Sequence, residues 1–134
     1  MKHANKEIAY LERYISLQKL RLTDKTHIDF QIKGNVDTVE ISPMLLIPFV
    51  ENAFKYGVSN EVDTTIKIVI EIVKKDIHLL VDNTKLPTKT IIEASNQIGI
   101  NNVRSRLDLI YGNRHTLTIN DSDTHYKVQL KIST

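Results

Sequence analysis

The sequence contains no cysteine, and glycine and proline are scarce, with four and three among 134 residues. The absence of cysteine excludes disulfides and thiolate metal sites, and it fits a reducing, cytosolic setting. No apolar run approaches the roughly 20 residues that a membrane-spanning helix needs. The first residues also lack the apolar segment of a signal peptide. These absences favour a cytoplasmic domain without linkers or repeats.

The composition is otherwise that of an ordinary globular domain. Hydrophobic residues make up 41% and charged residues 25% of the chain, and the formal net charge is +2. A chain of this length can bury one core. The small positive charge permits contact with anions such as nucleotides, but it does not require a nucleic-acid partner.

Three segments have the periodicity of amphipathic helices. Residues 4–22 place an apolar stripe on one face, and charged side chains such as Glu7 are expected mostly off that stripe. Because this helix begins so abruptly, the chain is interpreted as a fragment of a longer protein. A third helix is predicted over residues 99–111, beginning at Gly99 and capped by Gly112.

The second helix has the strongest boundary signals. Ser42 is predicted as its N-cap and Pro43 as its first residue, and Gly57 follows its last residue, Tyr56. Pro48 lies inside this segment. It predicts either a kink or a short lead-in turn after which the main helix restarts.

Alternating apolar residues predict the strands. They cover residues 27–33, 39–41, 64–73, 77–83, 115–120 and 126–132. Residues 84–98 lack periodicity and contain Pro87, so a functional or mobile loop is expected there. The predicted fold is an α/β (α+β) two-layer sandwich, in which three helices cover one face of a mixed, mostly antiparallel sheet.

The second helix carries four polar side chains within an arc of roughly 140°, counted at about 100° per residue. They are Glu51, Asn52, Lys55 and Tyr56. An amide oxygen is a suitable Mg²⁺ ligand, a lysine can meet phosphate charge, and a tyrosine can flank a base or a sugar. Without further context, a surface helix with a Glu–Lys pair explains the pattern equally well.

The run FVENAFKYG at residues 49–57 resembles the N box of sensor histidine kinases, above all of the LytS-type branch. That family has the Bergerat-type ATP-binding fold, shared with gyrase and MutL. The resemblance implies that Asn52 is the Mg²⁺ ligand and that Lys55 contacts phosphate. It also implies that Glu51 is the acidic catalytic residue beside the asparagine.

Residues 81–85 resemble a second element of the family. In the family, this element is a strand that ends in an adenine-reading aspartate followed by glycines. Strand parity puts residue 83 on the face of the preceding apolar residues, so Asn83 is favoured as the adenine reader over Asp82. The glycines are missing, since Thr84 and Lys85 stand in their places. A strand end with ordinary turn residues is the alternative explanation.

The third element, residues 97–107, resembles the glycine-led helix with which the family binds phosphates. Free backbone N–H groups at such a helix start attract anions, and Gly99 would let them come close. Asn102 and Arg104 are the candidate phosphate contacts. An ordinary helix cap with two surface arginines, Arg104 and Arg106, is the alternative.

The resemblance covers nearly the whole chain and implies a division into two parts. Residues 1–22 resemble the helix that connects the family's dimerisation domain to its catalytic domain, and residues 23–134 form the ATP-binding catalytic domain. The family's phosphoacceptor motif does not occur, and none of the five histidines has its context. The chain is therefore expected to bind ATP without phosphorylating itself.

The implied function is that of a histidine kinase fragment. ATP and Mg²⁺ are the expected cofactors, and the expected partners are the protein's own histidine-bearing domain and a cognate response regulator. A nucleic-acid partner is not expected. The resemblance implies a cytoplasmic domain of a membrane-anchored sensor kinase, attached to the membrane only through other parts of the full protein. Two other functions stay open: a non-catalytic nucleotide-binding or protein-interaction module, and a nucleic-acid-binding domain that uses the helix of Arg104 and Arg106.

Overall fold

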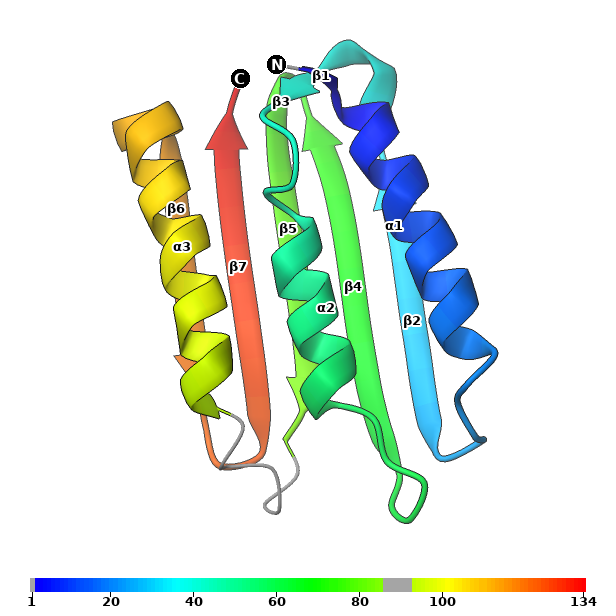
Figure 1. The fold of residues 1–134 in the computed structure, drawn as a ribbon. Coiled ribbons are helices and arrows are strands. Elements are labelled where there is room, and N and C mark those ends of the chain that lie inside the picture. Colours follow the sequence, from blue (N-terminus) through cyan, green and yellow to red (C-terminus); the bar gives the residue numbers. More distant parts are fainter. Residues whose placement is uncertain (1, 86–92) are drawn as a thin grey trace.

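The computed structural model describes residues 2–85 and 93–134, and it contains a five-stranded sheet with helices on one face (Figure 1). The strands are β2 (Thr26–Lys33), β4 (Thr64–Val73), β5 (Asp76–Thr84), β6 (His115–Asp121) and β7 (His125–Ser133). Two-residue strands β1 (Lys2–His3) and β3 (Glu40–Ile41) pair separately. The predicted strands therefore form as expected.

The order of the main sheet is β2-β4-β5-β7-β6. β2 pairs with β4 in parallel, and the other neighbours are antiparallel. The two hairpins, β4–β5 and β6–β7, join through β5 and β7, so β5 lies at the centre of the sheet. This arrangement confirms the predicted mixed, mostly antiparallel sheet.

In the described ranges, three α-helices lie side by side on one face of this sheet: α1 (Ala4–Lys19), α2 (Ile47–Tyr56) and α3 (Glu93–Tyr111). Figure 1 shows α1 over β2, α2 over the centre and α3 over β6 and β7. Short 3-10 helices, η1 (Val36–Thr38) and η3 (Gly112–Arg114), lie in connections. The predicted two-layer sandwich is thus confirmed.

The core lies between the two layers. Every second residue of β4 is buried, including Ile66, Ile68 and Ile70, because successive strand residues point to opposite faces. Ile8 and Leu11 of α1 belong to the same hydrophobic cluster as the sheet residues. Helix α1 therefore packs into the core of the domain that it precedes.

Two predicted helix boundaries are wrong. Helix α2 begins at Ile47 with Pro48 in its first turn, and turns over residues 43–46 precede it, so Ser42 is not its N-cap. This is the lead-in turn that Pro48 allowed, since proline fits the first turn of a helix and breaks its interior. Helix α3 begins at Glu93, so Gly99 lies inside it and the predicted loop over 84–98 is shorter; residues 86–92 fall outside the described ranges.

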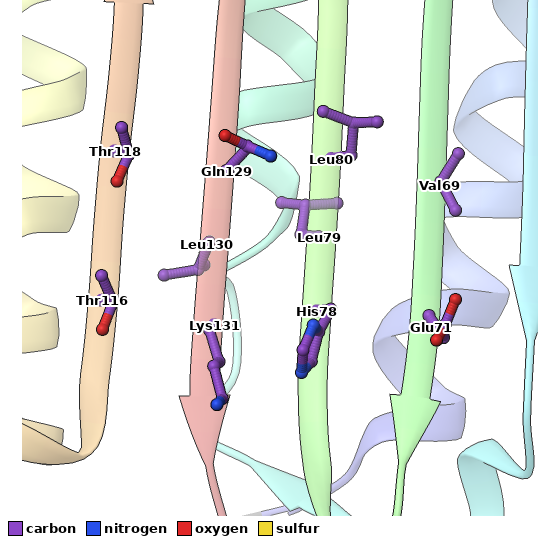
Figure 2. Close-up of a pocket in the computed structure, with 10 residues that line it drawn as sticks. All are labelled: Val69, Glu71, His78, Leu79, Leu80, Thr116, Thr118, Gln129, Leu130 and Lys131. Carbon is purple, nitrogen blue, oxygen red and sulfur yellow. The ribbon is translucent and has the colours of Figure 1, made fainter.

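The other face of the sheet bears no helix in the described part of the chain. A shallow depression of about 480 Å³ there is lined by β4, β5, β6 and β7 (Figure 2). Its lining includes aliphatic residues such as Val69 and Leu80, while Glu71, His78 and Lys131 lie opposite one another across three strands. These alternating charges suit a hydrated sheet face.

No helix among the described residues is both long and apolar enough to cross a membrane.

Candidate functional site

Three chain segments that carry predicted site residues meet at one end of the sheet. Figure 1 shows the end of β5, the end of α2 and the beginning of α3 at this same end. Asn83 lies at the end of β5, and Asn52, Lys55 and Tyr56 lie in the second half of α2. The structure thus places at one end of the sheet two elements whose candidate residues lie about thirty positions apart in the sequence.

Asn83 has the most informative environment in this region. Its side chain is on the helix-covered face and the residue is only 1% exposed, as strand parity predicted. Its amide nitrogen Nδ2 donates to the carbonyl oxygen of Thr84 at 3.0 Å. Its oxygen Oδ1 is buried and has no hydrogen-bond partner.

The Thr84 carbonyl decides which way the Asn83 amide points. A carbonyl oxygen can only accept, so the NH₂ group must face it and Oδ1 must face away. Thr84 is itself held, because its hydroxyl accepts a hydrogen bond from the backbone N–H of Thr65 at 3.1 Å. Asn83 therefore presents a fixed acceptor.

Asp82 lies on the opposite face of β5. Its carboxylate is 2.9 Å from Nδ1 of His125, on the neighbouring strand β7. A side chain on that face points away from α2 and α3. Asp82 is therefore not placed to act with Asn83, and the alternative register of the adenine-reading motif does not fit this geometry.

Gly57 brings the end of α2 close to Asn83. A Cβ atom at position 57 would lie 3.0 Å from Cβ of Asn83, 3.0 Å from Cγ1 of Ile66 and 2.8 Å from the carbonyl oxygen of Ala53. Real Cβ atoms are essentially never found closer than about 3.0 Å to other heavy atoms. Glycine at this position thus closes the helix and allows the close approach to β5.

The polar residues of α2 divide between two surroundings. Asn52 is 8% exposed, whereas Lys55 is exposed and Tyr56 half-buried. Glu51 lies close to Tyr14 of α1: burial raises the pKa of the Tyr14 phenol, and the negative charge of Glu51 raises it further. Glu51 is therefore near α1, in a setting different from that of Asn52.

Helix α3 presents its predicted residues on an exposed surface. Gly99, Asn102 and Arg104 are all exposed. Gly99 is inside the helix, so the expected binding of an anion by free N–H groups at a helix start does not apply to it. A Cβ atom there would meet nothing within 4 Å, so packing does not require glycine.

The residues that replace the family's glycines continue the sheet. Thr84 pairs with His125 of β7, and the backbone N–H of Lys85 donates to the Thr124 carbonyl at 2.8 Å. The ammonium group of Lys85 forms an ion pair with Asp121 of β6. The end of β5 is therefore anchored to the β6–β7 hairpin.

Sequence reasoning missed two charged residues that organise the approach to α2. Glu7 was expected off the buried stripe of α1, but it is 7% exposed and bonded to backbone N–H groups before α2. Arg106 was considered only as a surface arginine in the alternative explanation or as a nucleic-acid contact, but it donates to backbone carbonyls of the same segment. The spacing of Glu7 four residues before buried Leu11 was the available signal.

Solved structures of histidine kinases share this fold. The catalytic domain of histidine kinase ThkA matches with a TM-score of 0.59 and 17% identity, over 97% of this chain and 88% of that one. The histidine kinase domain of a blue-light-activated kinase from Erythrobacter litoralis matches with a TM-score of 0.65 and 18% identity, over 92% of this chain and 59% of that one.

Two curated relatives match most of the sequence. An uncharacterized sensor-like histidine kinase from Staphylococcus epidermidis is 30% identical over 118 residues, covering 79% of this chain and 23% of the relative. The sensor protein kinase HptS from Staphylococcus aureus is 28% identical over 130 residues, covering 86% and 24%. The chain belongs to the catalytic (HATPase) domains of sensor histidine kinases.

This histidine kinase catalytic domain spans about a quarter of the length of the curated relatives it matches. A structure of ThkA in complex with the response regulator TrrA also matches, with a TM-score of 0.55 and 18% identity, over 96% of this chain and 38% of that one. No family model matches the sequence.

Proposed function

We propose that this domain binds ATP with Mg²⁺ and supplies the γ-phosphoryl group for phosphorylation of a histidine on a separate domain. The observation that carries the proposal is the buried, unpartnered Oδ1 of Asn83 beside the end of α2. A buried acceptor without a partner costs about 1–3 kcal/mol. The exocyclic amino group of adenine is a donor that would remove this cost.

Three polar residues of α2 have the chemistry to bind the rest of the nucleotide. Asn52, on the helix that Gly57 caps, offers an amide oxygen of the kind that Mg²⁺ accepts together with water. Lys55, the second-to-last residue of α2, offers positive charge to the phosphates. Half-buried Tyr56 has an apolar ring to flank the base or the sugar.

Helix α3 supplies the remaining candidates. Arg104 and Asn102 are exposed on the helix next to α2, so both can reach phosphate oxygens. Gly99 leaves the surface of α3 open beside them. We assign these three residues to the phosphate side and Asn83 to the base side of the nucleotide.

In the proposed reaction, a bond forms between the phosphorus atom and a ring nitrogen of the acceptor histidine while the bond to the ADP oxygen breaks. Such transfer depends mainly on positioning and on charge neutralisation. Lys55 and Arg104 would neutralise phosphate charge, and Glu51 would receive or orient the histidine's proton. The acceptor belongs to the protein's own dimerisation domain, preceding residues 1–22, and the product serves a cognate response regulator in the cytoplasm.

Substitution of the Mg²⁺ ligand tests the site. In Asn52→Ala, a non-hydrolysable ATP analogue should bind no more tightly with Mg²⁺ than without it, because the ligand amide is gone. Calorimetric titration measures both affinities, and Asn113→Ala, an exposed asparagine in η3, is the matched control. Full Mg²⁺ dependence in Asn52→Ala would remove Asn52 from the site.

A second function is favoured by the anchored end of β5. Thr84 and Lys85 tie this segment to β6 and β7, where glycines are expected in an active kinase of this family. A domain that binds nucleotide without transferring phosphate would tolerate this rigidity. The two functions separate when the histidine-bearing domain is added with ATP: phosphohistidine formation supports the kinase, and nucleotide binding without it supports the module.

A further inference from the structure

Residues 42–46 form the connector between β3 and α2, and a side chain from α1 holds its N–H groups. Oε1 of Glu7 accepts a hydrogen bond from the backbone N–H of Met44, and Oε2 accepts one from Leu46 at 3.0 Å. Burial raises the pKa of the Glu7 carboxyl, whereas these N–H donors and the charge of Arg106 lower it. A buried carboxylate is thus committed to the connector.

Helix α3 holds the carbonyl groups of the same connector. The Arg106 guanidinium donates through Nη1 to the Met44 carbonyl at 3.0 Å and through Nη2 to the Pro43 carbonyl. At the end of α3, the hydroxyl of Tyr111 accepts a hydrogen bond from the backbone N–H of Ser42 at 3.0 Å. Figure 1 shows the connector running between α1 and α3 toward α2.

Met44 is the strained point of the connector. Its φ angle is +64°, in the left-handed region that residues other than glycine rarely adopt. Its side chain is 48% exposed, so core packing does not impose this conformation. The peptide groups on both sides of Met44 are instead fixed by Glu7 and Arg106, as expected where the surroundings over-determine a strained residue.

Helix α2 follows directly on this connector. It has ten residues, and its N-cap residue Leu46 makes no side-chain capping bond. The Glu7 carboxylate supplies acceptors to the backbone just before the helix and places negative charge near its N-terminus, where that charge is favourable. Asn52 lies only six residues beyond Leu46.

We propose that Glu7 and Arg106 are positioning residues that set the Mg²⁺-dependent part of nucleotide affinity. By fixing the connector they fix the direction of α2, and thereby the position of the Asn52 amide oxygen. Both side chains bond to the connector, and neither is assigned as a nucleotide ligand. The inference rests on the proposed function. It means that α1, through Glu7, and α3, through Arg106, both influence the position of the Asn52 amide oxygen.

The test uses conservative substitutions at both positions. Glu7→Gln keeps one acceptor oxygen but turns an NH₂ group toward the second backbone N–H. Arg106→Lys keeps the charge, but an ammonium group cannot reproduce a bidentate contact with two carbonyls. Glu12→Gln and Arg13→Lys change exposed residues of α1 in the same way and are the matched controls.

The quantity to measure is the Mg²⁺ enhancement, the Kd of a non-hydrolysable ATP analogue in EDTA divided by its Kd in Mg²⁺. Circular dichroism first establishes that each variant is folded at the titration temperature. We expect each single variant to lower the enhancement by roughly tenfold, because small displacements of a ligand-positioning group have effects of this order. The controls should leave it unchanged. The double variant should lose less than the product of the two single losses, because both residues act on one connector.

The affinity for nucleotide in EDTA distinguishes a positioning effect from a general disturbance of the site. Mg²⁺-free binding is assigned to Asn83 in β5, so we expect the affinity of each variant in EDTA to stay within about twofold of the wild-type value. Equal losses in EDTA and in Mg²⁺, or an unchanged enhancement in both variants, would overturn the inference while leaving the proposed function intact. Wild-type protein that binds no nucleotide would overturn both. If Glu7→Gln does not fold, Arg106→Lys decides by the same criterion.

Discussion

At the scale of single residues, the proposed role of Asn83 gives an amide the place that a carboxylate holds in the family's motif. A carboxylate only accepts, whereas an amide could present either its oxygen or its NH₂ group. The Thr84 carbonyl removes this ambiguity and leaves Oδ1 toward the buried side. The bond offered to a ligand donor is neutral, so it is weaker than one made by an aspartate.

The fixed amide predicts which purine is preferred. ATP offers an amino group to Oδ1, whereas ITP offers a carbonyl oxygen that would face another acceptor. We expect wild-type protein to bind ATP more tightly than ITP by roughly tenfold or more. In Asn83→Ala, ATP binding should weaken by about 1 kcal/mol, with the preference largely lost. Competition titrations with both nucleotides measure this, and an unchanged ATP/ITP ratio in Asn83→Ala would exclude Asn83 as the base reader.

Two glycines predict opposite responses to the same substitution. Gly57→Ala should destabilise the fold by about 1–3 kcal/mol, because its Cβ would overlap Ala53, Ile66 and Asn83. Gly99→Ala should stabilise it by about 0.5–1 kcal/mol, since the position is helical and open. Urea unfolding measures both.

The same Gly99→Ala protein also tests the phosphate assignment. If the open surface of α3 receives phosphate, the more stable variant should bind the ATP analogue less tightly. Unchanged nucleotide affinity together with higher stability would show that Gly99 is unnecessary at the site.

At the scale of elements, the buried carboxyl of Glu7 links α1 to the connector before α2, and its titration should make folding stability depend on pH. Burial raises the pKa of Glu7 above 4.5 in the folded protein. In the window from 4.5 up to that raised pKa, the folded state therefore binds more protons than the unfolded state, and stability falls as pH rises. Above this window, the carboxyl is ionised in both the folded and the unfolded state, so it causes no further change of stability with pH.

Comparison with Glu7→Gln isolates this contribution, because glutamine does not titrate. The unfolding free energy of wild type minus that of Glu7→Gln should decrease as the pH rises from about 4.5 toward neutrality. Urea unfolding at several pH values measures the difference, with Glu12→Gln as the control. A difference that rises with pH would mean that the carboxyl is stabilised in its charged form.

The elements that sequence predicted well are those in which one local pattern dominates. Strand β4 has its predicted bounds because the strict alternation of its isoleucines fits only a strand with one buried face. The start of α2 was wrong because the N-cap signal of Ser42 and Pro43 competes with long-range bonds from Glu7 and Arg106. Such partners are more than thirty residues away, and local propensity cannot identify them.

The same distinction holds for the candidate site. The helical arc of α2 made Asn52 and Lys55 candidates, and strand parity predicted the face of Asn83, since both depend only on local periodicity. The orientation of the Asn83 amide and the close contact with Gly57 depend on how β5 meets its neighbours. They required the assembled sheet.

At the scale of the whole molecule, the three helices occupy one face of the sheet, and the end of β5, the end of α2 and the beginning of α3 lie at the same end of it. The charged, hydrated face of β4 to β7 lies on the other side of β5 from Asn83, so the depression in Figure 2 is separate from this site. Helices α1 and α3 both contact the connector before α2. The proposed nucleotide site would therefore have structural support from two flanking helices.

The most direct test of this account is calorimetric titration of the wild-type chain with a non-hydrolysable ATP analogue, with Mg²⁺ and in EDTA. We predict saturable binding that tightens when Mg²⁺ is present, because Asn52 and the phosphates then share the ion. Absence of binding at millimolar nucleotide would contradict the central claim.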